Sequence, residues 1–134
     1  MGRFIQVKYL LDTHTWLWLE GDSAKLSNTV SKACFNPQNT LLVSAASAWE
    51  IQIKARTGNL TVPNAILQYR VTQQGVYDYQ WLPILPTHLL AYSATPTFHK
   101  DPFDLMLITQ AMVEQMPILS HDSKFSSYPI TVIW

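Results

Sequence analysis

Short apolar runs alternate with longer stretches of helical periodicity along this chain. That alternation is typical of an α/β fold with a mostly parallel sheet. The apolar runs predict five strands, at residues 7–13, 40–44, 77–85, 117–122 and 130–134. Helical spacing and capping residues predict about six helices between them. We therefore expect a three-layer α/β/α sandwich with a five-stranded sheet, formed by one domain that spans residues 1–134.

Capping residues and prolines mark the boundaries of the expected helices. Ser44 or Ser47 begins a helix that runs to Gly58, and Ser47 with Glu50 has the spacing of a capping box. A further helix is expected over residues 63–74, where a proline opens the segment. The clearest helix covers residues 101–115, which begin with an aspartate and a proline.

The composition is that of a folded domain without net charge. Apolar residues make up 48% of the chain and charged residues only 13%, which excludes disorder as a description of the whole chain. Nine basic and nine acidic residues give a formal net charge of zero. Such a chain is not expected to bind nucleic acid non-specifically over a broad basic surface. The low charge suggests instead that part of the surface is kept apolar for a partner.

The sequence indicates a cytoplasmic protein without a membrane span. A single cysteine, Cys34, excludes an internal disulfide and is expected to be a small core residue of its helix. No run of about 18 apolar residues is present, so no membrane-spanning helix is expected. The first residues match a strand rather than a signal peptide.

Two aspartates stand where strands are expected to end. Asp12 ends the run YLLD, and Asp122 ends the run PILSHD. The carboxyl ends of parallel strands meet at one edge of a sheet, where open α/β sheets bind ligands. Each aspartate also suits a simpler role, Asp12 as the cap of the next helix and Asp122 as the cap of a turn.

Asp104 lies on the apolar stripe of its helix. It shares the spacing i, i+3, i+4, i+7 with three apolar residues, Leu107, Ile108 and Ala111. Its carboxylate is therefore expected to point inward beside the strand ends, although compensation of the helix dipole is an alternative role. Asp101, at the start of the same helix, is expected to act as its N-cap.

Glu50 completes a set of four acids whose convergence would require a cation. On its own, Glu50 forms a favourable i, i+4 pair with Lys54. Two carboxylates about 4 Å apart repel by about 4 kcal/mol at an effective dielectric constant of about 20. A hard divalent ion such as Mg²⁺ or Mn²⁺ would offset that repulsion. The candidate catalytic residues are Asp12, Glu50, Asp104 and Asp122, and the candidate metal ligands are Asp12, Asp104 and Asp122.

Four segments, in this order, resemble the acidic motifs of PIN-domain nucleases. They read LLDTH, SAASAWEI, HKDPFDLMLITQA and ILSHDSKF. The resemblance is greatest to the VapC-like toxins of type II toxin–antitoxin systems, and it extends from the first strand to the terminal ITVIW. The acids that match the family's motifs are Asp12, Glu50, Asp104 and Asp122. Ser120 matches a position that is often Thr or Ser, and Asp101 belongs to a DPFD variant of the third motif.

The resemblance implies a single PIN-like domain with the activity of a metal-dependent endoribonuclease. Such an enzyme hydrolyses RNA phosphodiester bonds with Mg²⁺ or Mn²⁺ and is inhibited by a cognate antitoxin protein. Glu50 would bind the ion through water or position the attacking water. We also expect a homodimer with two-fold symmetry, which is the commonest closed assembly.

Other polar and aromatic residues are secondary candidates. His14, His99 and His121 flank the acids, where a histidine can contact a phosphate or orient a carboxylate, although the polarity of turns is the simpler explanation of all three. Lys100 and Lys124 are candidate phosphate contacts.

The tryptophans divide into expected core and surface residues. Trp49 and Trp81 are expected in the core. Trp16 and Trp18 are two residues apart on a short helix, so both cannot easily face inward, and one suits a partner surface.

Two other functions are compatible with parts of the pattern. A PIN-like module that binds RNA or protein without cleaving it would differ from a nuclease by lacking hydrolysis. An aspartate-based phosphotransferase would use Asp12 as its nucleophile, but LLDTH lacks the second carboxylate that such enzymes often carry two residues later.

Overall fold

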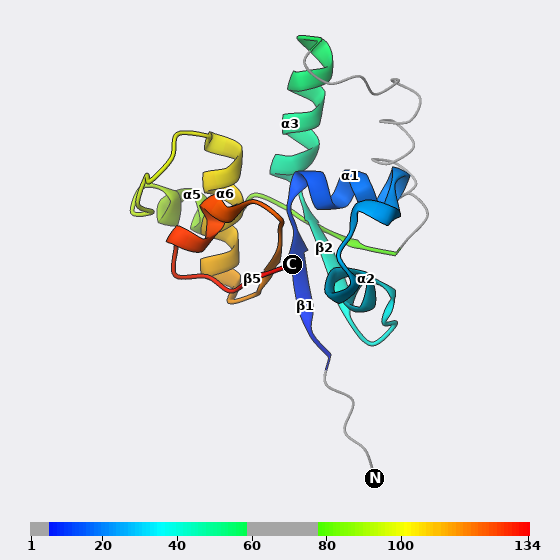
Figure 1. Cartoon of the computed structure of the whole chain (residues 1–134). Coiled ribbons are helices and arrows are strands. Elements are labelled where there is room, and N and C mark those ends of the chain that lie inside the picture. Colours follow the sequence, from blue (N-terminus) through cyan, green and yellow to red (C-terminus); the bar gives the residue numbers. More distant parts are fainter. Residues whose placement is uncertain (1–5, 59–77) are drawn as a thin grey trace.

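The computed structural model describes residues 6–58 and 78–134, in which five strands form one parallel sheet (Figure 1). The strands are β1 (Lys8–Leu11), β2 (Thr40–Ser44), β3 (Gln80–Leu82), β4 (Ile118–Leu119) and β5 (Val132–Ile133). Their order is β3-β2-β1-β4-β5, and each neighbouring pair is parallel. The expected five-stranded α/β/α fold is confirmed.

Five α-helices are seen in the described residues, and four of them begin at side-chain caps. They are α1 (Thr13–Gly21), α2 (Asn28–Phe35), α3 (Ala45–Arg56), α5 (Pro86–Tyr92) and α6 (Pro102–Glu114). Short 3₁₀ helices are η1 (Ser23–Lys25) and η2 (Ser123–Ser127). The side chains that accept backbone N–H groups at the first turns of α1, α2, α3 and α6 belong to Asp12, Ser27, Ser44 and Asp101. These caps satisfy donors that a helix cannot pair internally.

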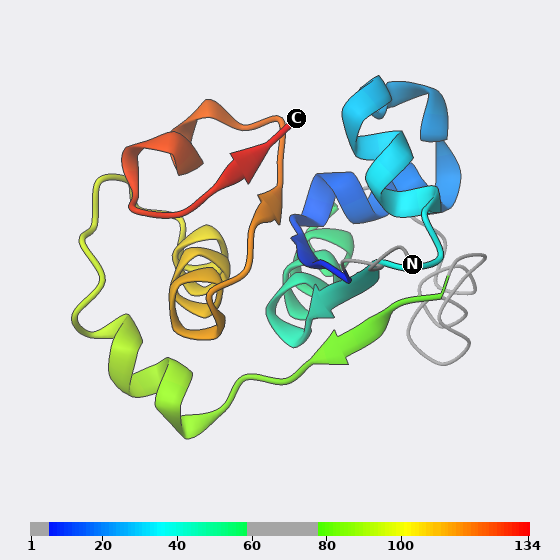
Figure 2. The same cartoon turned by 90° about the horizontal axis from the view of Figure 1, so that it is seen from below.

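Alternate strand residues fill two cores, one on each face of the sheet. Leu11 and Leu119 belong to the core that contains residues of α1, α2 and α3. Leu10 and Ile118 belong to the core that contains residues of α6. Figure 2 shows α1 and α2 on one side of the sheet and α6 on the other. This alternation buries the central strands on both faces, which explains their continuous apolar sequence.

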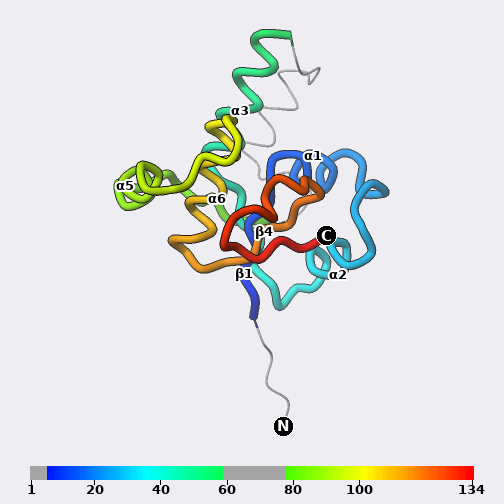
Figure 3. The backbone as a smooth tube through the Cα atoms, turned by 60° about the vertical axis from the view of Figure 1, so that its left-hand side comes forward, coloured from blue at the N-terminus to red at the C-terminus, as the bar shows by residue number. Residues whose placement is uncertain are grey.

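Strands that are distant in the sequence meet at the centre of the sheet. Leu10 of β1 pairs with Leu42 of β2 on one side and with Ile118 of β4 on the other. Figure 3 shows β1 and β4 side by side. Because all pairs are parallel, the carboxyl ends of β1, β2 and β4 lie at one edge, where α1 and α3 also begin.

A buried polar cluster fixes α3 relative to α6. The Ser44 hydroxyl, which caps α3, donates a 2.6 Å hydrogen bond to Oε1 of Gln110 on α6. The Gln110 amide donates to the carbonyl of Pro83, at 3.2 Å. Ser44 and Gln110 are both fully buried, so the energetic cost of breaking these bonds is large.

The structure corrects several details of the expected elements. The strand expected at 117–122 is only two residues long: β4 ends at Leu119, and Ser120, whose backbone N–H still donates to the carbonyl of Ile133, turns its side chain to Asp12. The strand expected at 77–85 ends before Pro83, which has no backbone N–H for a sheet. The helix expected at 63–74 lies outside the described residues.

The inward face of α3 also differs from expectation. Trp49 is 59% exposed, so its expected place in the core is wrong, whereas Trp81 is half-buried and packs against the core. The reason is that α3 turns Ser47 and Glu50 inward. The Ser47–Glu50 capping box is wrong too, since Ser44 is the N-cap. Cys34 is buried, as expected.

Within residues 6–58 and 78–134, no helix combines the length and the hydrophobicity needed to cross a bilayer.

Candidate functional site

Asp12 stands directly after β1 and is tied to the end of β4. Its Oδ1 accepts the backbone N–H of Thr15 at 2.7 Å, and its Oδ2 accepts the hydroxyl of Ser120 at 2.5 Å. The Ser120 hydroxyl in turn accepts the backbone N–H of Asp122 at 3.0 Å. The carboxyl ends of two central strands are therefore joined through one carboxylate.

Asp12 is buried but well supplied with hydrogen bonds. Its side chain belongs to a residue that is only 5% exposed. Burial raises the pKa of Asp12 above its usual value, because the charged form loses hydration. The hydrogen bonds from Ser120 and Thr15 act in the opposite direction and stabilise the carboxylate.

Glu50 is held by hydroxyl groups and one lysine. The Thr13 hydroxyl lies 2.7 Å from Oε1 of Glu50 and 3.0 Å from Oγ of Ser47. Lys54 donates to Oε2 of Glu50 at 2.6 Å, which confirms the expected i, i+4 pair. Glu50 is 3% exposed whereas the side chain of Lys54 is 39% exposed, so the carboxylate faces inward and the lysine reaches it from the solvent side.

Lys54 is a cation in direct contact with one of the acids. The hydrogen bond that Lys54 donates to Glu50 raises the pKa of Lys54, and burial opposes that effect. The negative charges of Glu50, Asp101 and Asp104 also raise the pKa of Lys54. A single ammonium group therefore balances part of a larger negative charge.

The first turn of α6 contributes two more acids. Asp101 is the N-cap, as expected, and its Oδ1 accepts the backbone N–H groups of Phe103 and Asp104. Burial and four neighbouring carboxylates raise the pKa of Asp104 to about 7. In order of effect, these carboxylates belong to Asp101, Glu50, Asp122 and Asp12. Asp104 thus lies within electrostatic reach of every other candidate acid.

His99 faces Asp104 from the loop before α6. Phe98 donates its backbone N–H to the hydroxyl of Tyr128, which lies 3.0 Å from Nδ1 of His99. If that hydroxyl donates to Nδ1, the remaining proton of a neutral ring is on Nε2. The buried Nε2 has no hydrogen-bond partner among the described residues, and it lies 3.7 Å from Oδ2 of Asp104.

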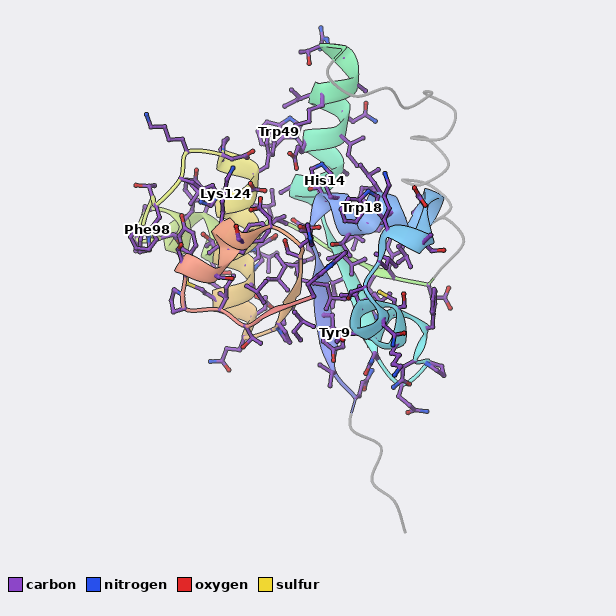
Figure 4. All side chains as sticks on the ribbon, viewed as in Figure 1. Tyr9, His14, Trp18, Trp49, Phe98 and Lys124 are labelled. Atoms are coloured by element: carbon purple, nitrogen blue, oxygen red, sulfur yellow. The ribbon has the colours of Figure 1, made fainter. Side chains whose placement is uncertain are left out.

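A pocket of about 440 Å³ opens beside two of the acids. Asp12 and Asp122 contribute to its lining. The remaining lining residues are His14, Trp18, His121 and Ser123. Figure 4 shows His14 and Trp18 next to one another on α1. The pocket therefore combines carboxylates with aromatic rings.

The acids approach one another without forming a finished cage of ligands. In the part of the chain that the structure describes, no group of three or more His, Cys, Asp or Glu side chains is arranged to hold a metal ion. The arrangement instead concentrates negative charge at the carboxyl edge of the sheet.

A comparison with known families identifies the chain. The family model of the PIN domain matches residues 9–130. The chain belongs to the PIN domain family. No curated protein sequence matches it significantly.

Solved structures that resemble this PIN domain include VapBC structures. The chain is similar to VapBC2 from Rickettsia felis bound to a DNA fragment from their promoter, with 13% identity and a TM-score of 0.72 over 95% of this chain and 98% of that one. VapBC-1 from nontypeable Haemophilus influenzae is 16% identical, with a TM-score of 0.65 over 95% and 97% of the two chains. VapBC-5 from Mycobacterium tuberculosis, a member of the VapBC family of toxin–antitoxin systems, is 13% identical, with a TM-score of 0.61 over 95% and 98%. At these identities the likeness concerns the fold.

The PIN domain brings the four expected acids to one edge of its sheet, and other residues join them. Asp101 acts both as the cap and as the strongest charged neighbour of Asp104. Tyr128 was missed, and Ser47 was expected only as a helix cap, because nothing in their local sequence indicates a partner that is distant along the chain. Lys100 and Lys124 are both exposed and remain predicted phosphate contacts.

Proposed function

We propose that this chain is a metal-dependent endoribonuclease of the VapC type, which hydrolyses RNA phosphodiester bonds and is inhibited by a cognate antitoxin. The observation that carries the proposal is the convergence of four acids from separate segments on one sheet edge. These acids are Asp12, Glu50, Asp104 and Asp122. Membership of the PIN family and a fold shared with VapBC structures support it.

The donor set suits a hard divalent cation. Carboxylate oxygens are preferred by Mg²⁺, which usually contacts one or two carboxylates and keeps several water ligands. Because Mg²⁺ keeps water ligands, it does not need a site in which protein side chains supply every ligand, and the described residues form no such complete site. We assign Asp12, Asp104 and Asp122 as the ligands. When bound, Mg²⁺ or Mn²⁺ lowers the pKa of water and stabilises negative charge on the phosphate.

The chain's own residues position these groups before any ion arrives. Ser120 and the Thr15 N–H fix both oxygens of Asp12. Thr13 and Lys54 fix the two oxygens of Glu50, which then orients a water molecule for attack. Both carboxylates keep free lone pairs on these oxygens, because each oxygen accepts one of the described hydrogen bonds.

Assembly with itself and with an antitoxin completes the proposal. Large apolar side chains remain exposed on α3 and α5, including Trp49 at 59%, Leu89 at 57% and Leu90 at 75%. Exposed apolar groups of this size are typical of surfaces that a partner covers. We expect a homodimer. A native mass of one protomer at micromolar concentration, measured without antitoxin, would contradict that expectation.

The activity is tested with labelled single-stranded RNA and the purified chain. Mg²⁺ or Mn²⁺ should produce internal cuts, and EDTA should abolish them. Asp104→Asn should remove cleavage, whereas Asp78→Asn, which changes an exposed acid outside the set, should leave it unchanged. A protein that binds metal and RNA without cutting any RNA would instead be a non-cleaving binding module.

A further inference from the structure

The pocket beside Asp12 and Asp122 is built from aromatic rings as much as from acids. Trp18 is half-buried and belongs to the side chains that pack against the core under α1. His14 and His121, which also line the pocket, are exposed. Packing against the core explains the buried part of the Trp18 side chain. It does not explain why two exposed imidazole rings line the same pocket.

Trp18 is the centre of a cluster of rings from both ends of the chain. Its ring centroid lies 6.0 Å from His14, 6.5 Å from His121 and 5.7 Å from Trp134. His121 and Trp134 are themselves 5.2 Å apart. These contacts are tilted or edge-on, so no ring covers another face to face. The cluster fixes the ring of Trp18 in place next to an open pocket.

A planar, uncharged ligand group suits this place better than a phosphate does. In the proposed nuclease the phosphate contacts the cation held by Asp12 and Asp122, which line one part of the pocket, so the aromatic part is left to another portion of the nucleotide. A nucleobase carries no net charge and presents a flat face that stacks on aromatic side chains. The Nζ of Lys25 lies over the ring of Trp18, 5.9 Å from its centroid, and pairs with Asp22 at 3.6 Å. A base that stacks on that side of the ring would displace this ammonium group, which could then contact the adjoining backbone.

We propose that the pocket formed by His14, Trp18 and His121 is a nucleobase subsite, in which Trp18 stacks on one unpaired base of the RNA strand. The proposal rests on the proposed function, because the pocket is expected to hold a base of the RNA only if the acids beside it cleave that strand. The subsite gives a chain without net positive charge a means to hold RNA that does not depend on a basic surface. It also makes cleavage require an unpaired nucleotide.

Binding is measured separately from cleavage, with a fluorescently labelled 2′-O-methyl RNA hexanucleotide that resists hydrolysis. Stacking on one aromatic side chain contributes about 1–3 kcal/mol per base, so Trp18→Leu should weaken binding on the order of 10-fold or more. Trp18→Phe keeps a stacking face and should retain most of the affinity. Phe35→Leu is the control, because Phe35 is also exposed but precedes β2, at the opposite edge of the sheet from the acids.

A second series locates the base without changing the protein. Single abasic positions are introduced one at a time along the hexanucleotide. The wild-type chain should lose affinity on the order of 10-fold at one position, and Trp18→Leu should be insensitive to that same change. Thermal melting verifies that each variant is folded, and the wild-type series remains informative if Trp18→Leu is not.

The outcomes separate this subsite from the proposed nuclease. Cleavage of natural RNA together with affinity that ignores both Trp18→Leu and the abasic positions would overturn the subsite alone. Binding that depends on Trp18 without any cleavage would overturn the nuclease alone. Loss of antitoxin binding by Trp18→Leu, with RNA affinity unchanged, would assign the pocket to a protein partner and also overturn the subsite.

Discussion

Asp12 and Asp104 are both buried carboxylates with raised pKa values, but their surroundings differ. Asp12 receives hydrogen bonds from Ser120 and Thr15, which offset part of the cost of its burial. Asp104 faces four other carboxylates, and its pKa rises to about 7. The carboxylate of Asp12 already has a hydrogen-bond donor on each oxygen, whereas the first turn of α6 carries negative charge that a cation would stabilise. The comparison indicates that Asp12 and its hydrogen-bond donors supply the fixed geometry of the site, whereas Asp104 and its neighbours supply the uncompensated negative charge.

The largest effect is expected on cleavage when the unbalanced carboxylate is removed. Asp104→Asn keeps the size of the side chain but deletes a proposed metal ligand. We expect at least about a 100-fold loss of RNA cleavage, since even groups that only support metal ligands typically contribute 10–100-fold. The measurement is the rate of cleavage at saturating Mg²⁺. Activity close to wild type would show that Asp104 does not bind the ion.

A divalent cation should stabilise the wild-type fold and act mainly through Asp104. At about 100 times its dissociation constant, a bound ion raises the free energy of unfolding by about 2.7 kcal/mol. Thermal melts with and without Mn²⁺ measure this, and Asp104→Asn should lose most of the shift. An equal shift in both proteins would place the ion elsewhere.

Ser120→Ala should instead lower stability, by disrupting the hydrogen bonds around Asp12. The substitution removes a donor from the buried Asp12 and lowers the free energy of unfolding by about 1–3 kcal/mol. Chemical denaturation without metal measures the loss. Ser126→Ala is the matched control, because Ser126 is exposed, and it should change stability by less than about 0.5 kcal/mol.

Without metal, stability should depend on pH in an unusual direction. The pKa values of Asp104 and Asp12 are raised in the folded state, so the fold binds more protons than the unfolded chain between about pH 4 and 7. Their contribution is therefore greatest at the acidic end of that window and is lost as pH rises towards 7. The melting temperature should fall over this interval, and Asp104→Asn should flatten the trend.

The smallest effect is expected for Asp101→Asn. Asparagine caps helices about as well as aspartate, so the first turn of α6 should remain intact, with less than about 0.5 kcal/mol change in stability. Cleavage should change only slightly. A loss equal to that of Asp104→Asn would move Asp101 from the cap into the metal site.

The sheet was predictable because buried parallel strands are apolar on both faces. Leu10 and Leu11 fill opposite cores, and an unbroken apolar run is the only sequence pattern that permits this. Asp12 was predictable for the related reason that a carboxylate cannot stay inside such a strand and therefore marks its end. Asp122 was expected to end a strand in the same way, but it lies beyond β4, which stops at Leu119, and it caps η2, the simpler role that its sequence also suited.

The orientation of α3 was not predictable from its composition. Apolar residues usually indicate the inward face of a helix, yet α3 buries Glu50 and exposes Trp49. The deciding interaction is the hydrogen bond from Thr13, 37 residues earlier in the chain. A contact between distant segments leaves no periodic signal, and the same holds for Tyr128, which orients His99 from 29 residues away.

The central strand of the sheet comes first in the chain, and this order governs when the site can exist during synthesis. Asp12 is translated 108 residues before the serine that orients it. A nascent chain therefore cannot pair β1 with β4 until the segment that contains β4 has also left the ribosome. Contacts of such wide sequence separation also slow folding, since the loop must close before they form. Fragments that end before Ser120 should contain an incomplete acidic edge, however well their first helices fold.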